Sequence, residues 1–317
     1  MQTLYVVGGG RWARVIASEA LKIKGADLQV VVVSAKNRIG MEKWSIDNFS
    51  PKQISVRNNI PEIVLTNSFA YVANETRNRY ATLSALVRSR MPIIVEKPFM
   101  LNYKQCEEII NLYKSNEVFV ASSQVFRFME GLLKLKKVVT LDEVVLIEFS
   151  WCDMFKEIRN GETKFFEKDV PIYFDILPHI YSILSEVFGE LPINLVDVKS
   201  AKPSQEFSAF FKFNHRIDTN VFITRVGKRR ERIMRITTFS NLISFDFTVD
   251  ECIQISQNGV IIYEQIFEKG TGIQKMLSAF LHSEKSSPVD YRLEINTVFT
   301  VIRLCEIIQQ KLLSIES

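Results

Sequence analysis

Short apolar runs, rich in β-branched residues, alternate with helical patterns through the first 121 residues. The runs cover residues 4–7, 28–33, 70–73, 93–95 and 118–121, and a further short strand is expected over residues 63–65. Branched apolar residues on successive positions indicate a strand that is covered on both faces. Strands and helices in this alternating order predict a doubly wound parallel sheet, whose ligands bind at the carboxyl ends of the strands.

The pattern changes after residue 122. Apolar residues alternate at Val145, Ile147 and Phe149, as in an antiparallel strand, and further strands of this kind are expected up to residue 267. A chain of 317 residues is long enough for two domains. We therefore expect an α/β protein with a doubly wound parallel sheet in residues 1–121 and a mostly antiparallel open sheet in residues 122–317.

Composition and charge exclude several classes of protein. Apolar residues make up 47% and charged residues 24% of the chain, the balance of a globular protein rather than a disordered or collagen-like one. A net charge of +4 is too small to indicate nucleic acid as a partner. No run approaches the ~20 apolar residues of a membrane span, and a strand pattern begins at residue 4 without the basic segment of a signal peptide.

The cysteines are far apart in the sequence and lack the spacing of a zinc site or a disulfide framework. They are Cys106, Cys152, Cys252 and Cys305. We therefore expect reduced thiols, no metal and a cytoplasmic protein.

The basic surplus lies in one part of the chain. Residues 1–120 contain 16 basic and 10 acidic side chains, whereas residues 121–317 contain 24 and 26. The first part therefore carries a net charge of +6, which suits a domain that holds an anionic ligand.

A glycine-rich turn follows the first strand. Gly8, Gly10 and Ala13 fit the G-x-G-x-x-A pattern of dinucleotide-binding (Rossmann) domains. The first glycine allows the tight turn, and the second lets the backbone approach a pyrophosphate at the positive helix N-terminus. The alanine lets the helix pack closely on the strand. The alternative is a glycine-rich turn that binds no ligand.

The end of the second strand predicts which nicotinamide cofactor binds. An NAD-preferring site usually has Asp or Glu here, on the ribose 2′-hydroxyl. This chain has Ser34, Lys36 and Arg38, so a hydroxyl and two cations are available for a 2′-phosphate, and Arg11 adds a charge near the pyrophosphate. NADP(H) is therefore favoured over NAD(H). The alternative is that Lys36 and Arg38 are solvated loop charges.

Glu96-Lys97-Pro98 follows the buried strand 93–95, at the sheet edge where such folds keep their active sites. A lysine directly after an apolar strand is poorly placed to serve only solubility, and the proline permits a cis peptide bond that could turn the ammonium into a cleft. Lys97 is therefore a candidate catalytic residue. The alternative is a strand end exposed on the surface.

Asp175 and His179 are four residues apart in an expected helix, so they share one helix face. Histidine titrates near neutral pH and can act as a general acid or base, while the aspartate can orient it or bind a substrate hydroxyl. The alternative is a pair on the helix surface.

Taken together, these motifs resemble the Gfo/Idh/MocA family of oxidoreductases, which includes glucose-fructose oxidoreductase and inositol dehydrogenase. The likeness rests on the turn over residues 8–13, Ala73-Asn74 after a central strand, Glu96-Lys97-Pro98, and Asp175 with His179. It extends over nearly the whole chain. It implies a dinucleotide-binding Rossmann domain in residues 1–121 and a substrate-binding domain in residues 122–317. The open sheet of that second domain often mediates oligomers, so a homodimer or homotetramer is expected.

The resemblance also implies roles for individual residues. Lys97 would bridge the nicotinamide ribose and the substrate, His179 would be the general acid/base, and Asp175 would position the substrate. The expected cofactor contacts are Gly8, Gly10, Arg11, Trp12, Ala13, Ser34, Lys36, Arg38, Ala73, Asn74, Glu96 and Lys97. Two departures alter the expected pocket: Arg77 stands where the family has His, and bulky residues at 170–174 replace a Gly-Gly pair.

The expected reaction is hydride transfer between nicotinamide and a carbonyl or hydroxyl carbon of a sugar, a nucleotide-linked sugar or a polyol. Arg127, Trp151 and Tyr173 are expected substrate contacts, and Arg127 has an interdomain salt bridge as its alternative role. Two other hypotheses stay open. They are an NADPH-dependent imine reductase of natural-product biosynthesis and a non-catalytic NADP(H)-binding regulator.

Overall fold

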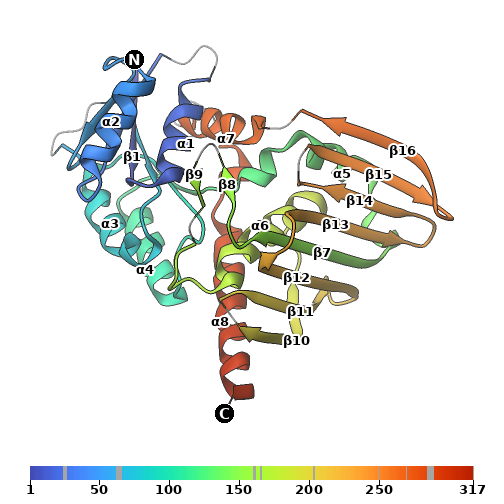
Figure 1. Ribbon diagram of the computed structural model, residues 1–317. Coiled ribbons are helices and arrows are strands. Elements are labelled where there is room, and N and C mark those ends of the chain that lie inside the picture. Colours follow the sequence, from blue (N-terminus) through green and yellow to red (C-terminus); the bar gives the residue numbers. More distant parts are fainter. Residues whose placement is uncertain are drawn as a thin grey trace. The chain divides into compact units, whose positions relative to one another are not determined.

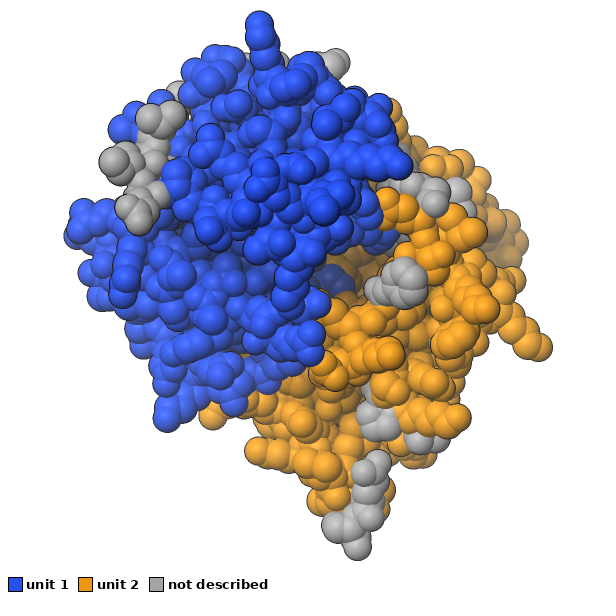
Figure 2. Space-filling model, turned by 60° about the vertical axis from the view of Figure 1, so that its left-hand side comes forward, with its two compact units in different colours: residues 1–124, 273–299 blue, residues 125–272, 300–317 orange. Residues whose placement is uncertain are grey.

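The computed structural model describes residues 1–23, 27–61, 66–159, 162–164, 166–202, 204–248, 250–268, 270–283 and 289–316. The chain forms two compact units, which Figure 2 shows in different colours. Unit 1 comprises residues 1–124 and 273–299, and unit 2 comprises residues 125–272 and 300–317. The domain division at residue 121 stays a prediction, and the expected strand over residues 63–65 lies outside the described residues.

Unit 1 is built on a parallel sheet. Its described strands are β1 (Gln2–Val7), β2 (Leu28–Val33), β3 (Ile54–Arg57), β4 (Ser68–Val72), β5 (Ile93–Val95) and β6 (Val120–Ser122), in the order β3-β2-β1-β4-β5-β6. Each pair of neighbours is parallel. The helices of this part, drawn in blue to teal in Figure 1, are α1 (Arg11–Ala20), α2 (Arg38–Asn48), α3 (Arg79–Leu86) and α4 (Tyr103–Ser115). The predicted doubly wound parallel sheet is confirmed.

The strand order places the turn after β1 at the switch point of this sheet. β1 pairs with β2 on one side and with β4 on the other, so successive strands are added on one side of β1 up to β3 and on its other side from β4 onward. Doubly wound sheets bind their ligands beyond the carboxyl ends of the strands at this point. Leu4, Val32 and Ile94 are fully buried, which explains the continuous apolar runs in the sequence.

Residues 273–299 return to unit 1 late in the chain. Phe280 of α7 (Thr271–Leu281) packs against Phe69 and Phe119, with ring centroids 5.5 and 6.4 Å apart. Gln2 Nε2 donates to the carbonyl oxygen of Leu281 at 2.9 Å. Helical periodicity predicts α7, but it does not indicate which sheet the helix packs on.

Unit 2 contains a mostly antiparallel sheet, which confirms the expected architecture. Its described strands are β7 (Val144–Met154), β10 (Ile193–Lys202), β11 (Glu206–Phe213), β12 (Ile217–Gly227), β13 (Glu231–Thr238), β14 (Leu242–Asp246), β15 (Glu251–Gln257) and β16 (Val260–Phe267). Their order is β10-β11-β12-β7-β13-β14-β15-β16, which Figure 1 shows from bottom to top. β7 and β12 pair in parallel, whereas the other described neighbours are antiparallel.

Helices pack on one face of this sheet. They include α5 (Glu130–Val138) and α6 (Ile172–Phe188), which contact β15 with β16 and β11 with β12, respectively. The last helix, α8 (Asn296–Glu316), meets α6, where Cys305 Sγ lies 3.8 Å from the carbonyl oxygen of Tyr173. Along β7 the odd-numbered residues from Ile147 to Asp153 are buried and those between them are half-exposed. Because alternate side chains of a strand point to opposite faces, the other face of the sheet is left open.

Several elements are not evident from the sequence pattern. Residues 151–171 are rich in charged and aromatic side chains and predict a loop. In the structure β7 continues to Met154, and β8 (Ile158–Arg159) pairs with β9 (Glu162–Thr163). α2 buries only Met41 and Ser45 among its residues, so it has no apolar stripe to reveal it. None of the helices in the described part of the chain has the length and apolar character needed to span a bilayer.

Candidate functional site

The glycine turn lies between β1 and α1 in unit 1. Gly8 has a φ of +150°, and a Cβ there would lie 2.8 Å from the carbonyl oxygen of Ala73. A Cβ on Gly9 would collide with the hydroxyl of Ser34, so both glycines are required by their neighbours. By contrast, nothing in the described chain lies within 4 Å of a Cβ on Gly10. Position 10 therefore borders an open space that the described residues do not fill.

The start of α1 suits an anion in that space. Gly10 is the N-cap residue, so no side chain caps the first N–H groups of the helix. The first turn has no acidic residue, and Arg11 supplies a cation there. Free N–H groups and the positive end of the helix dipole together bind phosphate. Because Ala13 is fully buried against the sheet, as expected, the turn fits the pyrophosphate of a dinucleotide.

Asn74 follows β4 and contributes an unsatisfied acceptor. Its Nδ2 donates to Thr82 Oγ1 at 2.7 Å, whereas its Oδ1 is buried and has no donor among the described residues. A buried acceptor of this kind is costly unless a ligand or a water molecule donates to it. Ala73 N donates to the carbonyl of Val7 at 2.8 Å, which holds this loop beside the end of β1. Asn74 therefore fits a contact with a ribose hydroxyl or an amide of the cofactor.

Ser34, at the end of β2, is bound to its own loop. Its Oγ accepts a hydrogen bond from Asn37 N at 3.3 Å, and Asn37 Nδ2 donates to the carbonyl of Gly9 at 2.7 Å. Asn37 thus ties the loop after β2 to the glycine turn. No sequence motif marks this residue, since its contact with Gly9 spans 28 positions.

Lys36, in the same loop, and Arg38, the first residue of α2, extend into solvent, and both have carboxylate partners. Lys36 Nζ lies 3.6 Å from Glu75 Oε2, and Arg38 Nε lies 2.6 Å from Glu42 Oε1. Burial acts to raise the pKa of Glu75, but the hydrogen bond from Arg77 and the charge of Lys36 outweigh it and hold that pKa below its ordinary value. A carboxylate therefore reaches Lys36 from the loop after β4, which inspection of the second strand alone does not reveal.

Trp12 and Glu96, two of the expected cofactor contacts, bond to each other in a buried network. Trp12 Nε1 donates to Glu96 Oε2 at 2.7 Å, and the Tyr71 hydroxyl donates a short hydrogen bond to the same oxygen. The Tyr71 hydroxyl also lies 2.8 Å from Ser123 Oγ. Burial, together with the charge of Glu96, raises the pKa of Tyr71 well above its usual value, so the phenol stays protonated. The network fixes α1 against the loop after β5.

Lys97 is half-buried at the carboxyl end of β5, and the peptide bond between Lys97 and Pro98 is cis, as the sequence permits. The buried side chain of Arg79 donates to the carbonyl oxygens of Asn74, Glu96 and Pro98. The loops after β4 and β5 therefore share one buried cation, which no sequence pattern indicates.

His179 lies on α6 within an aromatic cluster of unit 2. Its ring stacks on Trp151, with centroids 5.7 Å apart and an interplanar angle of 16°, and it meets the edge of Phe126 at 4.7 Å. The guanidinium of Arg232 lies 4.6 Å from the centroid of Trp151. The indole nitrogen of Trp151 is buried and has no acceptor among the described residues. His179 is thus held by aromatic rings, unlike a residue on an open helix surface.

A buried group of charges supports Trp151. Asp153 on β7 accepts hydrogen bonds from Arg232 Nη2 at 2.7 and 3.0 Å and from Lys164 Nζ at 2.7 Å. Burial acts to raise the pKa of Asp153, but the charges of Arg232 and Lys164 outweigh it and hold that pKa well below its ordinary value. The ionised carboxylate fixes Arg232 beside the indole that stacks on His179.

Asp175, one helical turn before His179 on α6, forms an ion pair. Arg225 Nη2 donates to Asp175 Oδ2 at 2.8 Å, and the guanidinium also lies 4.5 Å from the ring centroid of Phe166. Both partners of the pair are largely buried. A ligand that reaches Asp175 would meet an aspartate–arginine pair rather than an isolated carboxylate.

Arg127 and Tyr173 lie in the interior of unit 2. Arg127 Nε donates to Glu186 Oε2 at 3.2 Å, and both residues are at most 2% exposed. Both residues belong to unit 2, so this ion pair lies within one unit. The ring of Tyr173 packs on Phe207 at 5.4 Å, and burial raises the pKa of its phenol to about 12. These contacts give both residues a structural function, while their expected contact with substrate stays a prediction.

One signal for the missed charges was present in the sequence. Along β7 the inward-facing positions run through Ile147, Phe149 and Trp151 and end at Asp153. A charge at an inward position of an apolar alternation indicates a buried partner, because an unpaired charge there would be very costly. The partner is Arg232, which lies 79 positions further along the chain. The pairing of β7 with β13 brings it beside Asp153, so the sequence alone does not identify it.

Comparisons with known proteins support the assignment of unit 1. Residues 3–124 match the family model GFO_IDH_MocA, described as an oxidoreductase family with an NAD-binding Rossmann fold. The predicted resemblance is thereby confirmed for the N-terminal part of the chain. No curated protein sequence matches the chain.

Solved structures with a similar fold cover nearly the whole chain. The dehydrogenase MviM of Clostridium difficile has a TM-score of 0.77 at 14% identity, over 98% of this chain and 99% of that one. UDP-N-acetylglucosamine 3-dehydrogenase of Acidithiobacillus ferrooxidans has 0.75 at 15% identity, over 96% and 95%. A 3-ketoreductase of Actinomadura kijaniata, in complex with NADP and TDP-benzene, has 0.76 at 10% identity, over 95% and 94%. At these identities the likeness shows the fold.

Proposed function

The N-terminal domain of this chain belongs to the Gfo/Idh/MocA oxidoreductase family, and we propose that the protein is an NADP-dependent oxidoreductase that acts on a sugar, a nucleotide-linked sugar or a polyol. The observation that carries this proposal is the open space beside Gly10, at the uncapped start of α1. The buried acceptor Asn74 Oδ1, at the end of a neighbouring central strand, supports it.

NADP(H) is proposed as the preferred cofactor. The segment 34–38 after β2 offers the hydroxyl of Ser34 and the cations Lys36 and Arg38 to a 2′-phosphate, and it has no acidic residue of its own. Glu75 competes for Lys36, so we expect the preference for NADP(H) to be modest. The preference is a matter of exposed charges and therefore depends on salt.

Lys97 and His179 are proposed to act on the reacting carbonyl or alcohol. A bound nicotinamide supplies or accepts the hydride. Lys97 stabilises the negative charge that develops on the substrate oxygen, and His179 donates a proton to that oxygen in reduction and accepts it in oxidation. Stacking on Trp151 restricts rotation of the His179 ring, so its nitrogen atoms keep a defined direction.

A sugar-like substrate is consistent with the side chains around His179. Trp151 and Phe126 offer aromatic rings, and the buried indole N–H of Trp151 has a hydrogen bond to give. The Asp175–Arg225 pair offers both an acceptor and donors to hydroxyl groups. Two of the solved structures with this fold are named as a nucleotide-sugar dehydrogenase and a 3-ketoreductase.

A turnover assay tests this function. The purified protein is incubated with NADPH or NADH and with keto sugars, nucleotide-linked keto sugars and cyclic imines, and the loss of nicotinamide absorbance is followed. We expect turnover of a keto sugar, and a loss of about 10²–10⁴ in kcat for Lys97→Ala and for His179→Ala. The matched control is His215→Ala, which removes an exposed histidine of unit 2, the unit that contains His179. Full turnover by both variants would contradict the assigned roles, and turnover of imines alone would indicate an imine reductase.

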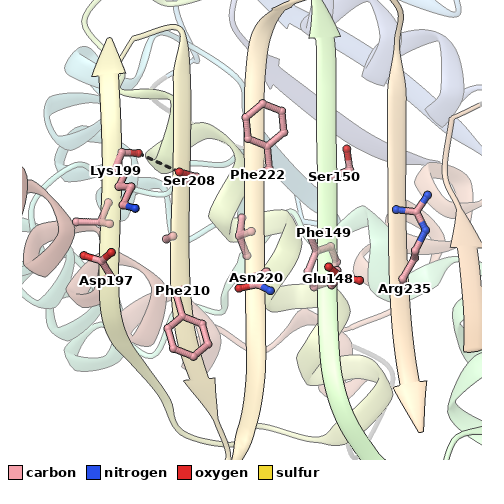
Figure 3. Close-up of a pocket in the computed structure, with 13 residues that line it drawn as sticks. Glu148, Phe149, Ser150, Asp197, Lys199, Ser208, Phe210, Asn220, Phe222 and Arg235 are labelled. Atoms are coloured by element: carbon pink, nitrogen blue, oxygen red, sulfur yellow. Dashed lines mark hydrogen bonds between the residues drawn. The ribbon is translucent and has the colours of Figure 1, made fainter.

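A homo-oligomer is also proposed, with the open face of the unit 2 sheet as its interface. Figure 3 shows this face, where Phe222, Asn220, Glu148 and Arg235 project from β12, β7 and β13 around a hollow of about 370 Å³. Phe222 is 39% exposed, which is unusual for a phenylalanine in the middle of a sheet. Half-exposed aromatic and apolar side chains on an uncovered sheet are typical of an interface.

A further inference from the structure

The guanidinium of Arg79 lies inside unit 1, where it joins two loops that carry expected cofactor residues. Arg79 is the first residue of α3 and is 1% exposed. Its Nη2 donates to the carbonyl oxygen of Asn74 at 2.8 Å. Its Nη1 donates to the carbonyl oxygen of Glu96 at 2.6 Å and also to that of Pro98. One side chain thus holds main-chain atoms after β4 and on both sides of Lys97.

These hydrogen bonds set the direction of the backbone at Lys97. In a trans peptide unit the carbonyl and the following N–H point in opposite directions within one plane. Because the carbonyl of Glu96 points to Arg79, the N–H of Lys97 points away from it, and the carbonyl of Pro98 turns the next N–H in the same way. The peptide planes on both sides of the Lys97–Pro98 unit are therefore oriented by Arg79.

These hydrogen bonds from Arg79 to the carbonyl groups of Asn74, Glu96 and Pro98, here called the clamp, depend on the shape of the guanidinium. Arginine presents five N–H donors in a rigid planar fork, whereas the lysine ammonium is a compact charge on a flexible stem. A buried guanidinium is destabilised by each of its N–H donors that loses an acceptor. Either loop could move away from Arg79 only by leaving part of a buried charge without a partner, so the positions of the two loops are coupled.

We propose that Arg79 is a positioning residue for the nicotinamide end of the cofactor. It acts through the backbone of the loops that carry Asn74 and Lys97, while the glycine turn at residues 8–13 holds the adenosine and pyrophosphate end. The inference rests on the proposed dinucleotide cofactor. The proposed site has two parts. Loss of the clamp should weaken binding of the nicotinamide part of the cofactor and leave binding of the adenosine and pyrophosphate part unchanged.

Calorimetric titration of Arg79→Lys tests the proposal without any turnover. The ligands are the more tightly bound of NADPH and NADH, and the matching fragment without nicotinamide, adenosine 2′,5′-bisphosphate or ADP. We expect the dinucleotide to bind at least about tenfold more weakly to Arg79→Lys than to the unchanged protein, and the fragment to bind equally well. If Arg79→Lys does not fold, Arg79→Gln, whose amide can donate to one of the loops, takes its place with the same expected pattern.

Two further variants sharpen the result. Tyr113→Phe removes the 2.9 Å hydrogen bond from Tyr113 to the carbonyl of Leu83, so it disturbs α3 without touching either loop, and its affinity for both ligands should be unchanged. In a Lys97→Met background, the effect of Arg79→Lys should shrink, since both substitutions act on the same contact. Equal weakening of dinucleotide and fragment, or weakening of neither, would overturn the clamp. Failure of the unchanged protein to bind NADPH or NADH would instead overturn the proposed function.

Discussion

At the scale of single residues, Gly8 and Gly10 differ in what requires them. An alanine at position 8 must adopt a φ of +150° with its Cβ 2.8 Å from the carbonyl of Ala73. We expect Gly8→Ala to lower the free energy of unfolding by about 1–3 kcal/mol. Urea denaturation measures this change. Gly10→Ala, whose Cβ meets nothing in the described chain, is the matched control, and equal destabilisation by the two substitutions would contradict the described turn.

Glu75 is expected to weaken the proposed preference for NADP(H). Its carboxylate lies 3.6 Å from Lys36 Nζ, so Glu75→Gln frees that cation for a 2′-phosphate and removes a repulsive charge. We expect NADPH to bind about two- to fivefold more tightly and NADH to be unaffected, with a smaller gain at high salt. Calorimetric titration at two salt concentrations measures the affinities for NADPH and NADH.

Glu19→Gln is the matched control, because Glu19 pairs with Lys22 at the other end of α1. Lys36→Ala should reduce the affinity for NADPH and leave that for NADH. If Glu75→Gln and Lys36→Ala both bind NADPH as the unchanged protein does, Lys36 does not contact the 2′-phosphate.

The sequence predicts residues at strand ends better than residues inside the fold. Gly10 and Asn74 follow recognisable strands, and the parallel order of these strands places their carboxyl ends at one edge of the sheet. Arg79 carries no such signal, because its function depends on carbonyl groups 5 to 19 positions away that only the folded backbone brings together. A charged residue at the start of a helix is otherwise ordinary on a protein surface.

At the scale of elements, the pair Asp153–Arg232 joins the neighbouring strands β7 and β13. Asp153→Asn leaves the cations Arg232 and Lys164 buried without their carboxylate. We expect a loss of about 3–5 kcal/mol in the free energy of unfolding at neutral pH. Urea denaturation followed by tryptophan fluorescence reports it, since Arg232 lies beside Trp151.

The same pair predicts a dependence of stability on pH. Because the pKa of Asp153 is held below its ordinary value in the folded state, its contribution to stability is complete above an unfolded pKa of about 4 and is lost as the pH falls below it. The difference in stability between the unchanged protein and Asp153→Asn should therefore narrow between neutral pH and about pH 3. A constant difference over that range would show that Asp153 is not the titrating group.

Element prediction succeeds where one face of an element is apolar and fails where it is not. β2 is apolar and buried over residues 30–33 and β5 over its whole length, because helices cover both faces of the parallel sheet. The short strands β8 and β9, two residues each, and the mixed helix α2 have no such pattern, so they emerge only in the folded structure.

At the scale of the whole molecule, the open face of the unit 2 sheet predicts assembly. Phe222→Asp places a charge at the centre of the proposed interface, where burial without a partner would be costly. We expect the variant to sediment as a monomer and the unchanged protein as a dimer or tetramer. Phe239→Asp, at a 77% exposed turn position, is the control and should sediment as the unchanged protein does. A monomeric unchanged protein would contradict the proposed assembly.

The return of residues 273–299 to unit 1 is a property of the whole chain that no local pattern contains. Phe280 is an ordinary apolar position of a helix, yet it packs on Phe69, 211 positions earlier, and completes the core of the first sheet. Its partner is determined by topology, which fixes which sheet lies within reach after β16.

The space beside Gly10 is proposed to hold a nicotinamide dinucleotide, and calorimetric titration with NADPH and NADH tests this binding site. We expect saturable binding of both, tighter for NADPH, and a loss of binding in Gly10→Val, whose added side chain fills that space. Thermal unfolding without ligand should show that Gly10→Val is folded. The absence of binding to the unchanged protein, or equal binding by folded Gly10→Val, would show that the dinucleotide does not occupy this space.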